Sequence, residues 1–152
     1  MNINPSNYAG LFLLSITLNT SIHAAGDMTA QPEIPMTIRL GNVDNSLRFY
    51  PDNLQFETGK LYKLILTNPS QQKHYFSAEG FARSIFTRKV QVISHNGKTI
   101  AEVKGHINEI EVYPGGKSEW WFVPIKRLES STLHCSIKGH SEAGMQGLIT
   151  IK

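Results

Sequence analysis

The sequence contains little charge, a single cysteine and no long apolar run. Charged residues make up 18% of the 152 residues, whereas hydrophobic residues make up 40%. This balance excludes the low-hydrophobicity, high-charge composition of disordered chains and, at this length, predicts one domain with one core. No stretch reaches the roughly 18 consecutive apolar residues that cross a bilayer, so no membrane span is predicted in the mature chain.

The charges of the two signs nearly cancel. Fifteen Lys and Arg against twelve Asp and Glu leave a formal net charge of +3, and the basic residues are scattered from Arg39 to Lys152. Nucleic-acid-binding proteins typically carry a dense basic face, which this sequence lacks, so nucleic acid is excluded as a partner. The small positive excess favours an acidic surface on any protein partner.

The N-terminal segment has the pattern of an export signal. Residues 9–18 form an apolar block of suitable length, and the polar residues after it lead to Ala24 and Ala25. A surface helix would need charged side chains toward solvent, but residues 1–25 contain none. We therefore predict a secretory signal peptide over residues 1–25, a mature domain over residues 26–152, and a periplasmic location.

Short segments rich in β-favouring residues recur through the rest of the chain, with turn-forming residues between them. Asn96-Gly97 is the pair that best fits a tight hairpin turn, and it separates two of these segments. This spacing predicts an all-β sandwich. The expected strands cover residues 34–40, 47–50, 54–57, 60–68, 90–94, 99–103, 107–113, 118–123 and 148–152.

Helix signals are scarce. Only residues 80–88 favour a short helix, because Phe81 and Ile85 are four positions apart and would share one face. Trp120 and Trp121 are adjacent in a predicted strand, so their side chains should point to opposite faces of a sheet. One tryptophan is expected in the core, and the other under a loop or at the surface.

The lone cysteine needs an explanation, since exported proteins usually pair their thiols. Cys135 begins the pattern Cys135-x4-His140-x4-Met145, which places a thiol, an imidazole and a thioether in one loop before the last strand. A second imidazole is available at His74, which follows a turn and begins another extended stretch. Two imidazoles and a thiolate with a weak axial thioether are the ligands of electron-transfer copper sites.

From about residue 34 to the end, and most closely over residues 133–152, the sequence is similar to the cupredoxins, the type 1 or blue copper proteins. The similarity rests on the Cys-x4-His-x4-Met-x-Gly loop before the closing strand and on the upstream histidine segment at residues 68–76. It implies a Greek-key β-sandwich with a short helix or insertion around residues 79–104. It also implies one copper ion with the equatorial ligands His74, Cys135 and His140 and the axial ligand Met145.

The same resemblance implies how a partner would be met. In cupredoxins the second ligand histidine reaches the surface through an apolar patch where redox partners dock. Here that patch would surround His140 and include Gly139, Ala143, Gly144 and Met145. The chain departs from the family at Tyr75, where many members carry Asn or Asp after the first ligand histidine.

Other kinds of site are weighed by the same residues. A cysteine–histidine hydrolase would leave the co-located soft ligands unexplained. A single cysteine excludes a binuclear copper centre, and the absence of any His-x-His excludes the trinuclear cluster of multicopper oxidases. His134 keeps a second copper open, because in copper nitrite reductases the histidine before the cysteine ligates a catalytic copper.

We therefore predict a monomeric, non-enzymatic one-electron carrier that serves a redox partner protein. The alternative is a periplasmic protein for copper storage, delivery or tolerance. Methionine-rich or histidine-rich tracts would support that alternative, but the mature chain has only Met28, Met36 and Met145 and no histidine cluster. A third possibility is a redox subunit of a larger oxidase or reductase.

Overall fold

The computed structural model describes residues 26–152, and the predicted signal peptide lies outside the described residues. The one helix of this part is α1 (Glu79–Ala82). The strands, in chain order, are β1 (Ile34–Leu40), β2 (Phe49–Tyr50), β3 (Asn53–Phe56), β4 (Tyr62–Thr67), β5 (His74–Ser77), β6 (Ile85–Ile93), β7 (Thr99–Val103), β8 (Glu109–Val112), β9 (Lys117–Pro124), β10 (Leu128–His134) and β11 (Gln146–Ile151).

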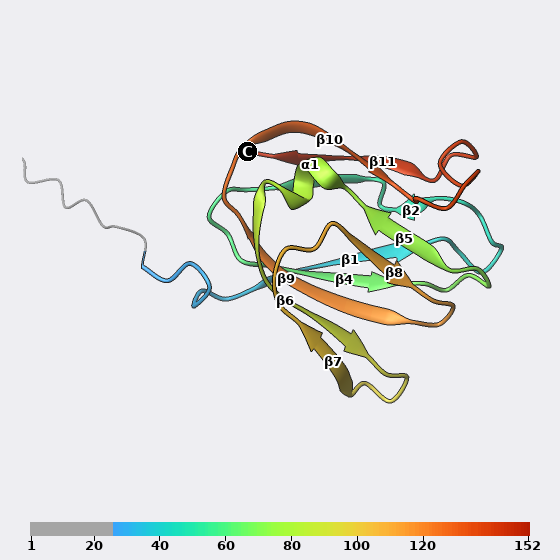
Figure 1. Ribbon diagram of the computed structural model, residues 1–152, viewed down its shortest axis with the longest axis horizontal. Helices are drawn as coiled ribbons and strands as arrows, with labels where there is room; N and C mark the ends of the chain where they lie inside the picture. Colours follow the sequence, from blue (N-terminus) through green and yellow to red (C-terminus); the bar gives the residue numbers. More distant parts are fainter. Residues whose placement is uncertain (1–25) are drawn as a thin grey trace, which may run out of the picture.

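Two sheets form a sandwich around one main hydrophobic core (Figure 1). The first sheet has the order β2-β1-β4-β9-β6-β7, and the second has the order β3-β11-β10-β5-β8. Both sheets are mixed, because β1 pairs with β4 and β3 pairs with β11 in parallel. The chain thus crosses repeatedly between the sheets, and the prediction of an all-β Greek-key sandwich is confirmed. No described helix has the length and apolar character that crossing a membrane would require.

The alternation of side chains in the strands decides which face is buried. In β4 every second residue is buried, which is the pattern of a strand with one face on the core. Strand β9 lies in the middle of the first sheet and is buried on both faces. Trp120 enters the main core, whereas Trp121 packs on the opposite face with Leu61 and Val123. The predicted opposition of the two tryptophans is confirmed.

The helix predicted over residues 80–88 is wrong in extent. Helix α1 ends at Ala82, and Ile85 already belongs to β6, where it pairs with Pro124 of β9. The β-branched side chains in β6 and its pairing with β9 favour the strand over further helical turns. The predicted hairpin at Asn96-Gly97 is confirmed, with β6 and β7 antiparallel and Gly97 at φ 80°. Figure 1 shows this hairpin extending beyond the second sheet.

Strand β10 was not among the predicted strands. Its sequence is largely polar and has no apolar alternation, and only Ser131 and Leu133 are buried. Pairing with β11 on one side and β5 on the other supplies its order. His134 lies opposite Ser77, the last residue of β5, so the next residue, Cys135, lies beside β5, where its Sγ accepts the Tyr75 N–H.

Candidate metal centre

Three predicted ligands from separate parts of the chain meet at one end of the sandwich. His74 is the first residue of β5, Cys135 follows β10 directly, and His140 lies in the loop between β10 and β11. Their ligand atoms all lie within 4.8 Å of one another. Among residues 26–152, this is the only group of three or more His, Cys, Asp or Glu side chains that converges in this way.

The spacing of the donor atoms matches a metal ion between them. Cys135 Sγ lies 3.5 Å from Nδ1 of His140 and 4.0 Å from Nδ1 of His74. Metal–nitrogen bonds of about 2.0 Å and a metal–sulfur bond of about 2.3 Å, arranged at about 120°, would separate nitrogen from sulfur by about 3.7 Å. Both imidazoles therefore present Nδ1 to the same point as the thiol sulfur.

Burial differs between the ligands. His74, Cys135 and Met145 are fully buried, whereas His140 is half-buried. Met145 belongs to the same core cluster as Cys135, and its carbonyl accepts the Cys135 N–H at 3.2 Å. Because Met145 is buried, it does not contribute to the surface patch that the resemblance implied, and that part of the expectation is wrong.

Backbone hydrogen bonds shape the ligand loop. The His140 N–H donates to the carbonyl of Ile137 at 3.0 Å, and the Met145 N–H donates to the carbonyl of His140 at 2.9 Å. Gly139 and Gly144 have φ values of 87° and 105°, in the region that glycine adopts without strain. These turns bring the two ends of the loop together, so His140 folds back over Cys135.

The sulfur receives one backbone hydrogen bond. The N–H of Tyr75 donates to Cys135 Sγ at 3.3 Å, which stabilises negative charge on a thiolate. Tyr75 stands where the resemblance leads us to expect Asn or Asp, but the contact uses only the backbone. The link between β5 and the cysteine therefore does not need Asn or Asp at residue 75.

His74 is ready to bind a metal at neutral pH. Burial, and to a smaller extent the nearby His140, lower the pKa of His74 from its ordinary value of 6.5 to about 4. The imidazole is therefore uncharged at pH 7 and keeps one ring nitrogen free for a metal.

Acidification is expected to destabilise the copper-free protein through this group. In the unfolded chain His74 titrates near pH 6.5, whereas folded His74 has a pKa of about 4. Between these values only the unfolded chain binds the proton, so the free energy of unfolding falls as the pH drops, by at most about 1.4 kcal/mol per pH unit. Urea unfolding at about pH 7 and about pH 5 measures the loss.

A matched pair of variants isolates this contribution. His74→Gln should flatten that part of the pH dependence, whereas His106→Gln, at an exposed histidine, should keep it. Equal pH dependence in the wild type and in His74→Gln would contradict the assignment.

His134 is separate from the three convergent ligands. It is half-buried and lines a surface cavity of about 420 Å³ that also includes Glu79 and Glu109. Glu109 is already held by the hydroxyls of Ser77 and Ser136, at 2.7 and 3.0 Å. The structure therefore brings His74, Cys135 and His140 together, whereas His134 faces this surface cavity.

Sequence reasoning missed the residues that surround His74. Ser70 Oγ lies 3.0 Å from His74 Nε2, and Asn68 hydrogen-bonds Ser70 in turn. Gly41, with φ 79°, comes so close that a Cβ there would lie 2.9 Å from His74 Nε2. The only sequence signal was the turn pattern Asn68-Pro69-Ser70, which says nothing about contact with a histidine.

Comparison with known proteins shows which solved structures have a similar fold. No family model matches the sequence, and no curated protein matches it. Among solved structures, the multicopper oxidase from Aquifex aeolicus superposes with a TM-score of 0.57 at 17% identity, covering 79% of this chain and 29% of that chain. The multicopper oxidase from Campylobacter jejuni has a TM-score of 0.54 at 17% identity, covering 88% of this chain and 32% of that one.

A single-domain structure is also similar. Auracyanin A, a blue copper protein from Chloroflexus aurantiacus, has a TM-score of 0.50 at 14% identity, covering 80% of this chain and all of the other. The chain has the cupredoxin fold. It spans about a third of the multicopper oxidases' length. Within the cupredoxin fold of this chain, the site of His74, Cys135 and His140, with Met145, fits a single type 1 copper ion.

Proposed function

We propose that the protein is a periplasmic type 1 copper protein that carries single electrons between redox partners, with His74, Cys135, His140 and Met145 as its copper ligands. The observation that carries this proposal is the convergence of two imidazole Nδ1 atoms and one thiol sulfur within 4.8 Å. The cupredoxin fold and the buried Met145 support it. The predicted signal peptide supports the location.

The donor set suits electron transfer. Bound copper would supply the reversible exchange of one electron, and a thiolate with two imidazoles binds both oxidation states well. His74 is anchored in a strand and Cys135 directly follows one, so the two ligands keep their positions when the charge of the metal changes. The Tyr75 N–H reinforces this by holding the sulfur. A site that moves little needs little reorganisation for each electron.

The exposed side of the site supplies a route to a partner. His140 is the only half-buried ligand, and the neighbouring Gly139, Ala143 and Gly144 are exposed and carry no charge. A partner that packs on these three residues would approach the imidazole of His140 without displacing a ligand. The net charge of +3 favours a partner with acidic residues at its rim.

Redox cycling in the presence of a Cu(I) chelator tests the carrier function. The copper-loaded protein is reduced with ascorbate and reoxidised with ferricyanide through several cycles. We expect the copper to stay bound and the visible absorption to return fully each time, because His74, Cys135 and Met145 are buried. Transfer of the copper to the chelator at the first reduction would instead indicate copper delivery.

A further inference from the structure

We propose that Ser70 is a positioning residue that fixes the tautomer of His74, so that Nδ1 faces the copper position with a free lone pair. This inference rests on the proposed copper function and deepens it. The evidence is a chain of buried hydrogen bonds that runs from β8 through Asn68 and Ser70 to His74. Along this series of hydrogen bonds, the donor and acceptor at each link fix which group donates at the next.

The first link fixes the side-chain amide of Asn68. Asn68 Nδ2 lies 2.7 Å from the carbonyl oxygen of Gln72 and 2.8 Å from the carbonyl oxygen of Val112. Carbonyl oxygens only accept hydrogen bonds, so the amide nitrogen must face them. Asn68 Oδ1 therefore faces Ser70, where it accepts the Ser70 N–H at 3.0 Å.

The second link commits the single hydroxyl proton of Ser70. Its Oγ lies 2.7 Å from Asn68 Oδ1 and 2.9 Å from the carbonyl oxygen of Gln72, and both are acceptors. Whichever of them takes the proton, none is left for His74. The oxygen thus turns a lone pair toward His74 Nε2, which lies 3.0 Å away.

The third link sets the imidazole. A lone pair on Ser70 Oγ favours a proton on His74 Nε2, and a neutral imidazole with a proton there has none on Nδ1. Nδ1 is the nitrogen that faces Cys135 Sγ at 4.0 Å. The series of hydrogen bonds therefore leaves Nδ1 without a proton before any metal binds. The hydrogen bond at Nε2 also raises the basicity of the imidazole as a ligand.

The surroundings protect this bond from water. Ser70, Asn68 and His74 are almost fully buried, with at most 1% of each residue exposed. Gly41 covers the bond, since a Cβ there would lie 2.9 Å from His74 Nε2 and 3.0 Å from Ser70 Cβ. Because water cannot compete for Nε2, the serine oxygen is its available partner.

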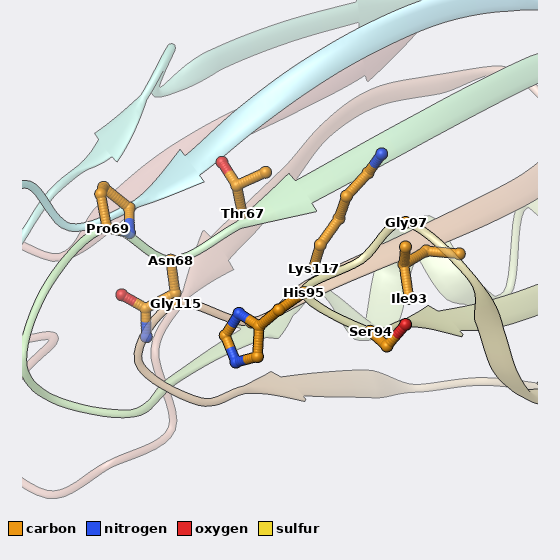
Figure 2. Close-up of a pocket in the computed structure, with 10 residues that line it drawn as sticks. Thr67, Asn68, Pro69, Ile93, Ser94, His95, Gly97, Gly115 and Lys117 are labelled. Carbon is orange, nitrogen blue, oxygen red and sulfur yellow. The ribbon is translucent and has the colours of Figure 1, made fainter.

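Asn68 connects this series of hydrogen bonds to a surface cavity. A surface cavity of about 390 Å³ lies between the end of β4 and two turns, and Figure 2 shows Asn68 and His95 among its lining residues. Neither Ser70 nor His74 lines that cavity. Asn68 therefore lies between this cavity and Ser70, which it contacts through Oδ1.

Nitrogen-15 NMR of the copper-free protein tests the tautomer directly. We expect the wild type at neutral pH to carry the His74 proton on Nε2, with slow exchange of that proton with water. Ser70→Ala should lose the slow exchange and populate the other tautomer, whereas Ser70→Thr, which keeps the hydroxyl, should restore the wild-type pattern. The matched control is Ser46→Ala, at a serine that bonds Tyr50 Oη and touches no ligand.

Competition with a Cu(I) chelator gives the second measurement. Loss of a hydrogen bond to the far nitrogen of a ligand histidine typically weakens metal binding about 10- to 100-fold, and we expect this loss for Ser70→Ala and not for Ser46→Ala. A purely structural role would lower stability without moving the tautomer.

The proposal is overturned if wild-type His74 carries its proton on Nδ1. This measurement uses the wild-type protein alone and does not depend on the folding of a variant. It is also overturned if Ser70→Ala keeps both the tautomer and the affinity. An Nε2 proton on His74 in a protein that binds no copper would support the hydrogen-bond chain and count against the copper function, so the two failures are distinguishable.

Discussion

Replacing Cys135 by serine is expected to abolish the intense visible absorption of the Cu(II)-loaded protein. That absorption arises from charge transfer between a thiolate and copper, and Cys135 is the only cysteine in the chain. Serine keeps the size of the side chain and places an oxygen where the soft donor stood. The two imidazoles remain, so some copper binding should persist, weakened by more than the 10- to 100-fold loss typical of a residue outside the ligand sphere.

The control for this variant is its neighbour, Ser136→Ala. Ser136 is exposed and donates to Glu109 at 3.0 Å, without contact to a ligand atom. Its absorption should equal that of the wild type. The spectra are recorded after Cu(II) is added to folded protein with a reduced thiol. A wild-type protein without the band, or a Cys135→Ser protein that keeps it, would contradict a copper–thiolate site.

The ligand set is the part of the site that could be read from the sequence. Cys135, His140 and Met145 lie within eleven positions of one loop. Residues so close in sequence stay close in space however the rest of the chain packs. His74 lies 61 positions before Cys135, and its inclusion required the assumption that two loops meet at one end of a sandwich. The register of β10 against β5 now supplies the physical reason for that meeting.

The surroundings of the ligands could not be read in the same way. Gly41, Asn68 and Ser70 act on His74 through contacts between the segments that follow β1 and β4 and the start of β5, and these contacts exist only in the folded chain. Strand β10 was missed for a related reason: its order comes from hydrogen bonds to two neighbours and little from its own polar side chains. Local patterns report a residue's type, whereas these roles depend on tertiary neighbours.

The helix α1 shows how a segment without a motif can matter for stability. Phe81 is fully buried, and its ring lies among four other aromatic rings. The ring-centroid distances run from 5.1 to 6.4 Å, mostly in edge-on geometry, to Phe122, Phe56, Trp120 and Phe76. The short helix therefore inserts one side chain at the centre of the core between the two sheets.

Phe81→Ala is expected to lower the free energy of unfolding by about 3–5 kcal/mol, because it removes a buried ring and leaves a cavity among rigid neighbours. Domains of this size are stable by only about 5–15 kcal/mol, so the variant should unfold at much lower urea. Phe86→Ala is the matched control from the same segment. Phe86 is 51% exposed, and its truncation should change the stability by about 0.5 kcal/mol or less.

Both variants should be unfolded in the copper-free state, because copper bound to the native protein adds stability by mass action and would hide part of the difference. A loss in Phe86→Ala as large as that in Phe81→Ala would contradict the assignment of Phe81 to the core. Phe76 contacts Phe81 and lies two residues after His74 on β5. The core around Phe81 therefore supports β5, the strand that carries the first proposed copper ligand. Phe81→Ala should also lower the affinity of the protein for copper.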